Sequence, residues 1–460
     1  MDDSLARVSL TAGPLRLRVN HADGTPWFAS PSATPFLEIG AYPGGPSPSR
    51  FHDPRLASPG GVEWRAPSRV SDDTVSGGSV ITLLDDRVGP VTVSIAAVIG
   101  APGTFHMHVE ARGRDAAMLR VHLAADEAGA YHGLGERFGR VDARGTIVPM
   151  QLHVDGRSES STNEAHVPVP FVASTRSYGL FVASREAGAF DVAATEATRV
   201  SATFEGAVAD VYLFAARTPG DVVAAYTRTA GLPRLPPRWA FGPMQWRNVW
   251  DSADAMLADA RRLRAEDIPT TTMWIDNPWE ASYNDHVFDT RRFPDPVALL
   301  GELRALGYRS IVWSTPYVDA VEDGASPANA AERLFVTARD RNWLVRYPAG
   351  LPYISISNPA SAAGIQARGG MMDFTSPEAS AFWTERLAPL MELGLRGFKL
   401  DYGEDIVSEI GGTRTRFAFA DGTSERAQHG LYPQGYHSAY RAALDQRAGG
   451  DGFLIVRASS

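Results

Sequence analysis

The first half of the chain alternates apolar and polar positions in short runs, which is the pattern of half-buried β-strands. Such runs cover residues 15–19, 80–84, 91–95, 104–109 and 209–214, and clusters of glycine, proline, aspartate and serine separate them. No long amphipathic pattern of helical period interrupts this half. Residues 1–230 are therefore predicted to form an N-terminal antiparallel β-sandwich domain.

A proline-rich linker marks a change in this pattern. Residues 218–221 (TPGD) predict the start of a short helix, and residues 231–238 then read GLPRLPPR. Three prolines in so short a span can neither continue a helix nor join a central strand. We therefore predict a domain boundary between residues 230 and 231.

Beyond the linker, apolar strands alternate with helices. Strands are predicted at residues 239–244, 271–276, 308–314, 397–402 and 453–457, an extended segment at 371–374, and helices at 251–265, 296–306, 375–394 and 436–446. This alternation is typical of βα units with a parallel sheet. No GxGxxG or Walker loop is present, so residues 231–460 are predicted to form a catalytic (β/α)8 barrel of the TIM type rather than a nucleotide-binding fold.

The predicted barrel is incomplete at its C-terminus. Only about five of its eight strands can be found, and an open barrel would leave an apolar sheet edge, which folded proteins avoid. We therefore expect the 460 residues to be a C-terminally truncated fragment. The alternatives are a wrong strand count or a smaller open sheet.

Composition narrows the classes of function. The chain carries a net charge of −9 and no cysteine, so disulfides, thiolate metal sites and a cysteine nucleophile are excluded. An acidic chain without a basic block argues against a nucleic-acid partner. No signal peptide or membrane-spanning stretch is visible, so the chain is expected to be cytoplasmic, without a membrane partner, although export stays open. A homo-oligomer stays open as well.

Two aspartates stand at predicted strand ends. Asp276 and Asp401 each follow an apolar strand, and Lys399 shares a strand face with Asp401. The carboxyl ends of barrel strands face the active site. A lysine beside a carboxylate keeps it ionised, as the nucleophile of a glycosyl transfer must be. The alternative is that both aspartates are helix caps or turn residues.

Aromatic side chains gather around the same strand ends. Trp246, Trp274 and Trp313 would stack on the apolar faces of sugar rings, or they could be ordinary core residues. Gln245 could bind substrate or satisfy the backbone of its own loop, and Glu404 could help to bind substrate by orienting the site or be merely solvated. No HExxH motif and no GxSxG elbow occurs, so neither a metal nor an α/β-hydrolase triad is expected.

At residues 397–404 (GFKLDYGE) the chain resembles glycoside hydrolase family 31, the α-glucosidase and α-xylosidase family. Similar segments follow the family's order: residues 131–138 (YHGLGERF), 236–242 (PPRWAFG), 268–276 (IPTTTMWID), 373–377 (DFTSP), 419–422 (FADG) and 456–459 (VRAS). Each segment alone is weakly specific, but together they cover most of the chain.

The resemblance implies a role for each matching residue. Asp401 would be the catalytic nucleophile, and Asp276 would hold hydroxyls of the non-reducing-end sugar. Lys399, Arg457, Trp274 and Trp313 would line the same subsite. The acid/base aspartate is expected after Ser460 and would be absent here, so the 460-residue chain is expected to be inactive or nearly so.

The resemblance also implies a retaining α-glycosidase that hydrolyses terminal non-reducing α-linked sugars of an oligosaccharide or α-glycoside, without a cofactor. The sequence around Gln245 and Trp246 departs from the commonest family pattern, so the identity of the sugar and the linkage stay open. The alternatives are a non-catalytic carbohydrate-binding relative, or a transglycosylase or α-glucan lyase of the same family.

Overall fold

The computed structural model describes residues 4–42, 61–73, 79–137, 139–150, 152, 167–321, 326–358, 367–404 and 416–458. These residues form two compact units that divide between Pro233 and Arg234. We call them the N-terminal unit and the C-terminal unit. Within the described part of the chain, no helix combines the length and apolar character needed to cross a membrane.

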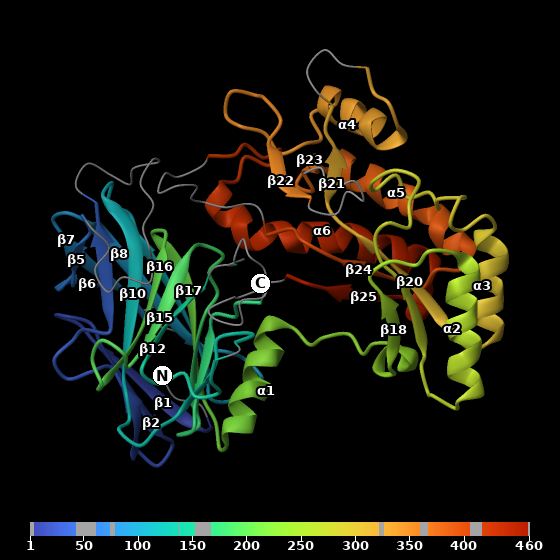
Figure 1. Ribbon diagram of the computed structural model, residues 1–460. Helices are drawn as coiled ribbons and strands as arrows, with labels where there is room; N and C mark the ends of the chain where they lie inside the picture. The colour runs from blue at the N-terminus through green and yellow to red at the C-terminus, as the bar shows by residue number, and fades with distance from the viewer. Residues whose placement is uncertain are drawn as a thin grey trace. The chain divides into compact units, whose positions relative to one another are not determined.

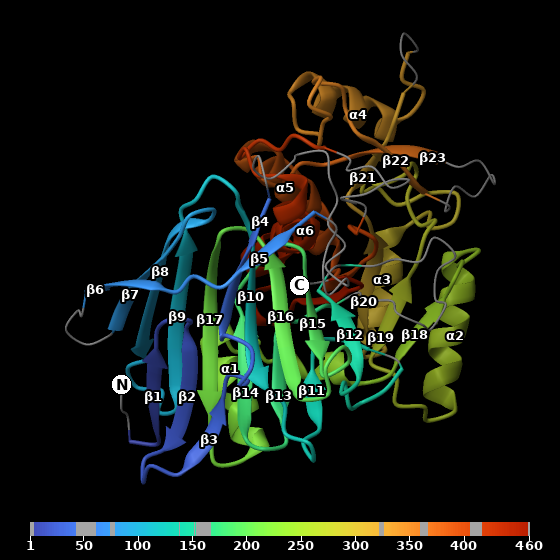
Figure 2. The same cartoon turned by 90° about the vertical axis from the view of Figure 1, so that its left-hand side faces the viewer.

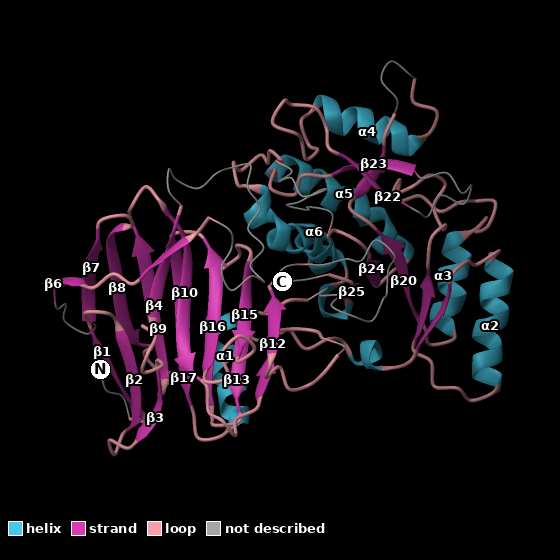
Figure 3. Ribbon diagram, turned by 60° about the vertical axis from the view of Figure 1, so that its left-hand side comes forward, coloured by secondary structure: helices cyan, strands magenta, loops and turns pink. Residues whose placement is uncertain are grey.

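The N-terminal unit consists of three antiparallel sheets (Figures 2 and 3). Their strand orders are β1-β2-β3, β12-β15-β16-β10-β4-β5 and β11-β13-β14-β17-β9-β8-β7-β6. The strands are β1 (Ala6–Thr11), β2 (Arg16–His21), β3 (Pro26–Ala29), β4 (Leu37–Ala41), β5 (Glu63–Arg65), β6 (Arg69–Asp73), β7 (Ser79–Asp85), β8 (Gly89–Ala97), β9 (Thr104–Ala111), β10 (Ala116–Ala124), β11 (Tyr131–Gly133), β12 (Thr146–Pro149), β13 (Phe171–Ser174), β14 (Tyr178–Val182), β15 (Gly188–Val192), β16 (Arg199–Glu205) and β17 (Val208–Ala215).

Period-two burial explains why these segments pair as a sandwich. Along β8 the side chains of Val91, Val93 and Ile95 are buried, and the residues between them are more exposed. On β9, Met107 and Val109 lie opposite Ile95 and Val93 in the antiparallel register and are buried too. Each strand thus presents one apolar face to the core. The predicted antiparallel β-sandwich is confirmed.

The helix α1 (Pro219–Ala230) lies at the end of the N-terminal unit. The side chain of Thr218 accepts a hydrogen bond from the backbone N–H of Asp221, which caps the helix as the sequence predicts. Val222 of α1 is buried against Phe171 and Phe214 of the sheet. The helix therefore covers part of the larger sheet.

The C-terminal unit is built on a five-stranded parallel sheet with helices packed against it (Figure 1). The strand order β18-β19-β20-β24-β25 follows the chain order, as in the first units of a (β/α)8 barrel. The strands are β18 (Met244–Arg247), β19 (Thr272–Ile275), β20 (Arg309–Ser314), β24 (Gly397–Leu400) and β25 (Phe453–Val456). The predicted barrel of about five βα units is confirmed.

Side-chain caps fix where the barrel helices begin. The helices are α2 (Ala253–Ala265), α3 (Pro296–Ala305), α5 (Pro377–Leu393) and α6 (Glu425–Arg447). The side chains of Ser252, Asp295 and Ser376 each accept a hydrogen bond from the first turn of α2, α3 and α5. Gly394 ends α5 in the left-handed conformation, where a Cβ would be strained. Local chemistry therefore agrees with the barrel topology.

The strand predicted at residues 239–244 is wrong. Residues 238–241 form a 3₁₀ turn, η1 (Arg238–Phe241), and β18 begins only at Met244. The indole N–H of Trp239 donates to Asp451 at 2.8 Å, and the Thr271 hydroxyl donates to the Trp239 carbonyl at 2.7 Å. Side chains thus satisfy the polar groups of this turn without a strand ladder.

The helix predicted at residues 436–446 is longer, since α6 begins at Glu425 and runs through Pro433. A proline inside a helix costs roughly 3 kcal/mol because it removes a hydrogen bond and crowds the preceding turn. Tyr432, Tyr436 and Tyr440, spaced four residues apart along α6, are all buried and offset this cost. Tertiary packing therefore outweighs the local signal of Pro433.

Most of the segment between β20 and α5 has no counterpart in the predicted elements. It contains β21 (Tyr317–Asp319), α4 (Ala330–Asp340), β22 (Ile354–Asn358) and β23 (Ala367–Met371). The three strands form a small antiparallel sheet in the order β21-β23-β22. The segment expected to be extended at 371–374 includes only the end of β23. A last 3₁₀ turn, η2 (Gly449–Asp451), precedes β25.

Candidate active site

Asp401 is the first residue after β24, at the carboxyl edge of the parallel sheet. Its backbone N–H donates to the carbonyl of Ser314 at 2.9 Å, which continues the pairing of β24 with β20. The residue is 9% exposed. The sheet therefore holds the start of this loop rigidly, with the carboxylate largely shielded from solvent.

Three donors converge on the Asp401 carboxylate. The Lys399 ammonium forms an ion pair with Oδ2, and the indole N–H of Trp313 donates to the same oxygen at 3.0 Å. The Arg457 guanidinium donates to Oδ1 at 3.3 Å. These donors come from β24, β20 and the end of β25, so the parallel sheet brings distant parts of the chain to one carboxylate.

These contacts decide the charge of Asp401. Burial by itself raises the pKa of the carboxyl, but the charge and hydrogen bond of Lys399, the hydrogen bond from Trp313 and the charge of Arg457 together outweigh burial. The pKa of Asp401 is therefore lowered from its ordinary value, and the group is ionised at neutral pH.

Arg457 is itself held in place by neighbours. Its Nε donates to Glu404 at 2.9 Å, and its guanidinium carbon lies 4.5 Å from the centre of the Tyr402 ring. Tyr402 has a φ of 58°, a left-handed conformation that costs energy for a residue with a Cβ. Glu404 is therefore placed to orient Arg457, and this strained turn starts the loop that supplies both Tyr402 and Glu404.

Asp276 follows β19 and is the second carboxylate of this neighbourhood. The indole N–H of Trp246 donates to one of its oxygens at 2.6 Å, and the backbone N–H of Asn277 donates to the other at 2.8 Å. The pKa of Asp276 is raised, chiefly by burial. The hydrogen bond from Trp246 and the charge of Lys399 oppose this rise, and the charge of Asp401 adds to it. The charge of Lys399 thus acts on both carboxylates, which links them in one site.

Tryptophans from successive loops reinforce the strand ends. The indole N–H of Trp250, after β18, donates to the carbonyl of Trp274 on β19 at 2.9 Å. In the same way Trp279, after β19, donates to the carbonyl of Trp313 on β20 at 2.8 Å. Trp250 and Trp279 are fully buried, so they act as core residues that fix the next strand.

The remaining predicted residues have mixed surroundings. Trp246 is 45% exposed, and its ring centre lies 5.9 Å from that of Trp274. The buried indole N–H of Trp274 has no hydrogen-bond partner in the described part of the chain. The Gln245 amide donates to the Trp246 carbonyl at 3.2 Å, which is the loop-satisfying alternative of the two that the sequence leaves open.

Tyr283 and Asp319 were missed by the sequence analysis. The ring of Tyr283 lies 5.7 Å from Trp313, edge to face, and its hydroxyl is 2.8 Å from that of Thr315. Burial raises the pKa of Tyr283, and the charge of Asp319 raises it further. Burial also raises the pKa of Asp319 to about 6. Asp319 lies on the unpredicted β21, and the position of Tyr283 in the loop after β19 was the available signal.

Parts of the predicted motifs lie outside the described residues. They are Phe138 of the segment 131–138 and Ser459 of the segment 456–459.

Sequence models of one protein family match both units. Residues 233–460 match the glycosyl hydrolases family 31 TIM-barrel domain. Residues 3–191 match the glycosyl hydrolase 31 N-terminal galactose mutarotase-like domain. Both models describe glycoside hydrolase domains, and together they cover most of the chain. The chain belongs to glycosyl hydrolase family 31.

Curated relatives agree with this membership. The chain is 28% identical over 334 residues to alpha-xylosidase XylQ of Lactiplantibacillus pentosus, a match of 71% of this chain and 40% of that protein. It is 28% identical over 290 residues to alpha-glucosidase 2 of Bacillus thermoamyloliquefaciens, a match of 61% of this chain and 34% of that protein. The matches thus span about two fifths or less of these relatives.

A solved structure shares the fold. A family 31 sulfoquinovosidase from E. rectale superposes with a TM-score of 0.75 at 15% identity, over 98% of this chain and 66% of that chain. At this identity the likeness supports the fold alone.

Proposed function

We propose that the chain carries the nucleophile and part of the sugar subsite of a retaining α-glycosidase. The observation that supports this most is the Asp401 carboxylate, buried yet ionised, with donors from three strands. A carboxylate that stays charged in a shielded site can attack an anomeric carbon and form a covalent glycosyl-enzyme. The lowered pKa of Asp401 supports the same role.

The substrate we propose is a terminal, non-reducing α-linked sugar. Asp276 would accept hydrogen bonds from its hydroxyls, and Arg457 and Lys399 would bind other oxygens close to Asp401. The buried indole N–H of Trp274 lacks a partner in the described residues and would donate to a hydroxyl. Glucosyl and xylosyl groups are the first candidates, because an alpha-xylosidase and an alpha-glucosidase are among the relatives.

The proposed reaction is a double displacement. Asp401 attacks the anomeric carbon as the bond to the leaving oxygen breaks, and water later displaces Asp401 with net retention. A natural leaving group needs a proton from a general acid, whereas fluoride leaves without one. A glycosyl fluoride therefore tests the nucleophile independently of the acid/base.

The decisive experiment is covalent trapping. The protein is incubated with 5-fluoro-α-glucosyl and 5-fluoro-α-xylosyl fluorides, and intact-mass and peptide mass spectrometry locate the adduct. We expect one glycosyl adduct on Asp401 and none in Asp401→Asn. The control Asp254→Asn changes an exposed aspartate of α2 and should label normally. An adduct on another residue, or labelling that persists in Asp401→Asn, would overturn the assignment.

A transferase is the second candidate, because an isomaltosyltransferase of Sporosarcina globispora is also a relative, 24% identical over 354 residues. Both reactions share the covalent step and differ in what removes the sugar from Asp401. Product analysis with an excess of free sugar distinguishes them, since hydrolysis releases a monosaccharide and transfer yields a new glycoside.

A further inference from the structure

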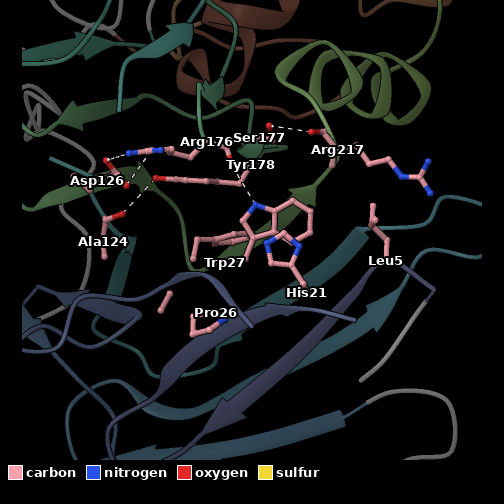
Figure 4. A pocket seen from close by; sticks show the side chains of 14 residues that line it. Leu5, His21, Pro26, Trp27, Ala124, Asp126, Arg176, Ser177, Tyr178 and Arg217 are labelled. Carbon is pink, nitrogen blue, oxygen red and sulfur yellow. Dashed lines mark hydrogen bonds and ion pairs between the residues drawn. The ribbon is translucent and has the colours of Figure 1, made fainter. Parts of the chain in front are cut away.

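A pocket of about 780 Å³ is lined entirely by residues of the N-terminal unit (Figure 4), and none of the residues described around Asp401 belongs to its lining. Its volume falls within the roughly 300–1,000 Å³ that is usual for small-molecule sites. It is formed where β2 and β3 meet the end of β10, the turn between β13 and β14, and the residues before α1. None of the roles proposed above uses this pocket.

One wall of the pocket is a fixed aromatic surface. The rings of His21 and Trp27 stack with their centres 3.9 Å apart and their planes 10° from parallel. The indole N–H of Trp27 donates to the carbonyl of Arg176 at 3.1 Å (Figure 4), which sets the orientation of the ring. Because the stack is already ordered, a ligand packing on it would lose little side-chain entropy on binding.

The pocket contains one ion pair and one arginine whose guanidinium is unpaired within the described residues. Arg176 and Asp126 form an ion pair at 3.2 Å, and the Tyr178 hydroxyl donates to the carbonyl of Ala124 at 3.4 Å. The exposed guanidinium of Arg217 has no ion pair or hydrogen bond within the described residues. Donors and acceptors thus line the same pocket as a flat apolar ring, the combination that a pyranose requires with its apolar face and its hydroxyl rim.

We propose that this pocket is a second saccharide-binding site, which holds one or two pyranose units and shares no residue with the site at Asp401. Trp27 packs on the sugar face, Arg217 donates to ring hydroxyls, and Asp126 with Arg176 accepts and donates at the opposite side. An isolated inorganic anion fits less well, because the carboxylate of Asp126 balances Arg176 and the aromatic wall would stay unused. The proposal rests on the proposed function in that the sugar is the same class of α-linked glycoside.

The experiment measures binding of maltose, isomaltose and isoprimeverose to the full chain by calorimetry and saturation-transfer NMR, in the Asp401→Ala background. That background blocks the covalent step but keeps the other sugar contacts proposed near Asp401, so the second site is identified as the part of the binding that Trp27→Ala and Arg217→Ala remove. We expect Trp27→Ala to weaken this binding at least about tenfold, and Arg217→Ala to weaken it roughly three- to tenfold. Trp27→Phe keeps a flat ring and should retain most of the binding.

The control Arg185→Ala removes an equally exposed arginine of the same unit that does not line the pocket, and it should bind as the parent does. Thermal melting checks that each variant is folded. If Trp27→Ala is not folded, the binding measured for Arg217→Ala tests the proposal. The proposal is overturned if no sugar binds in the Asp401→Ala background, if Arg217→Ala binds as tightly as Arg185→Ala, or if phosphate or sulfate binds and sugars do not. Covalent labelling of Asp401 is independent of all three results.

Discussion

Lys399 is expected to set the pH range in which Asp401 can act. In the folded chain its ammonium contacts Oδ2 of Asp401, and its charge is the largest influence that lowers the pKa of this carboxyl against burial. The substitution Lys399→Met keeps most of the volume of the side chain and removes the charge. Burial then dominates, and the pKa of Asp401 rises.

The size of the change follows from the geometry. An opposite charge in contact with a carboxylate shifts its pKa by about 1–3 units, and each unit corresponds to about 1.4 kcal/mol. The Arg457 and Trp313 contacts remain in the variant, so we expect a rise of about 1–2 units. A carboxyl with a lowered folded-state pKa stabilises the fold above its unfolded pKa of about 3.9, and this stabilisation is lost as the pH falls through the folded value.

Two assays read this change. The rate of trapping by a 5-fluoro-glycosyl fluoride falls at low pH as Asp401 takes up a proton, and in Lys399→Met this acid limb should move upward by about 1–2 units. Chemical denaturation should show the variant destabilised by about 1.4–2.7 kcal/mol at pH 7, with a smaller deficit near pH 3, where Asp401 is increasingly protonated in both proteins.

Two matched variants serve as controls for the effect of Lys399. Lys399→Arg keeps the charge and should leave the acid limb near its original position. Arg261→Gln removes one positive charge from α2, where Arg261 pairs with Glu302, and should shift nothing. An acid limb in Lys399→Met that coincides with that of the unsubstituted protein would refute the electrostatic account of Asp401.

Three further changes test other parts of the site and fold. Trp313→Phe removes the indole donor to Asp401, and since hydrogen bonds to charged groups contribute about 1.5–3 kcal/mol, trapping should slow roughly 10- to 100-fold with the fold retained by circular dichroism. Asp276→Ala should slow trapping equally for glycosyl donors with good and with poor leaving groups, because it removes a sugar contact. A defect that is confined to donors with poor leaving groups and is rescued by azide would instead identify Asp276 as an acid/base. Gly397→Ala places a Cβ against the carbonyl of Phe453, between β24 and β25, and should lower the unfolding free energy by about 1–3 kcal/mol in denaturant titration; unchanged stability would contradict that close packing.

The sequence predicted the order of the barrel strands because each combines an apolar run with turn or cap residues that match the topology. The caps at Ser252 and Ser376 show this agreement. The residues that meet at Asp401 could also be identified, since parallel strands bring their carboxyl ends to one edge. What the sequence does not contain is the pairing itself: nothing local predicts that Trp313 donates to Asp401, 88 residues away.

The wrong predictions have a common physical origin. The predicted helix began only at Tyr436, after Pro433, and the predicted strand began already at Trp239, because local propensity was weighed without tertiary partners. In the structure the buried tyrosines of α6 offset the proline, and Asp451 supplies a partner for the Trp239 indole. Tyr283 and Asp319 were missed because one lies in an irregular loop and the other in an unpredicted small sheet.

The repeated indole-to-carbonyl contact has a consequence for how this rim can change in evolution. The indole N–H of Trp250 donates to the backbone carbonyl of Trp274, and that of Trp279 donates to the carbonyl of Trp313. Each loop is therefore hydrogen-bonded to the strand that follows it rather than to the strand that precedes it. A mutation in one loop is therefore transmitted to the tryptophan on the next strand, Trp274 or Trp313, for which we propose a place in the sugar subsite. We expect Trp250 and Trp274 to change together in evolution, and likewise Trp279 and Trp313. Grafting a single loop from another member of the family should therefore fail where grafting two consecutive loops succeeds.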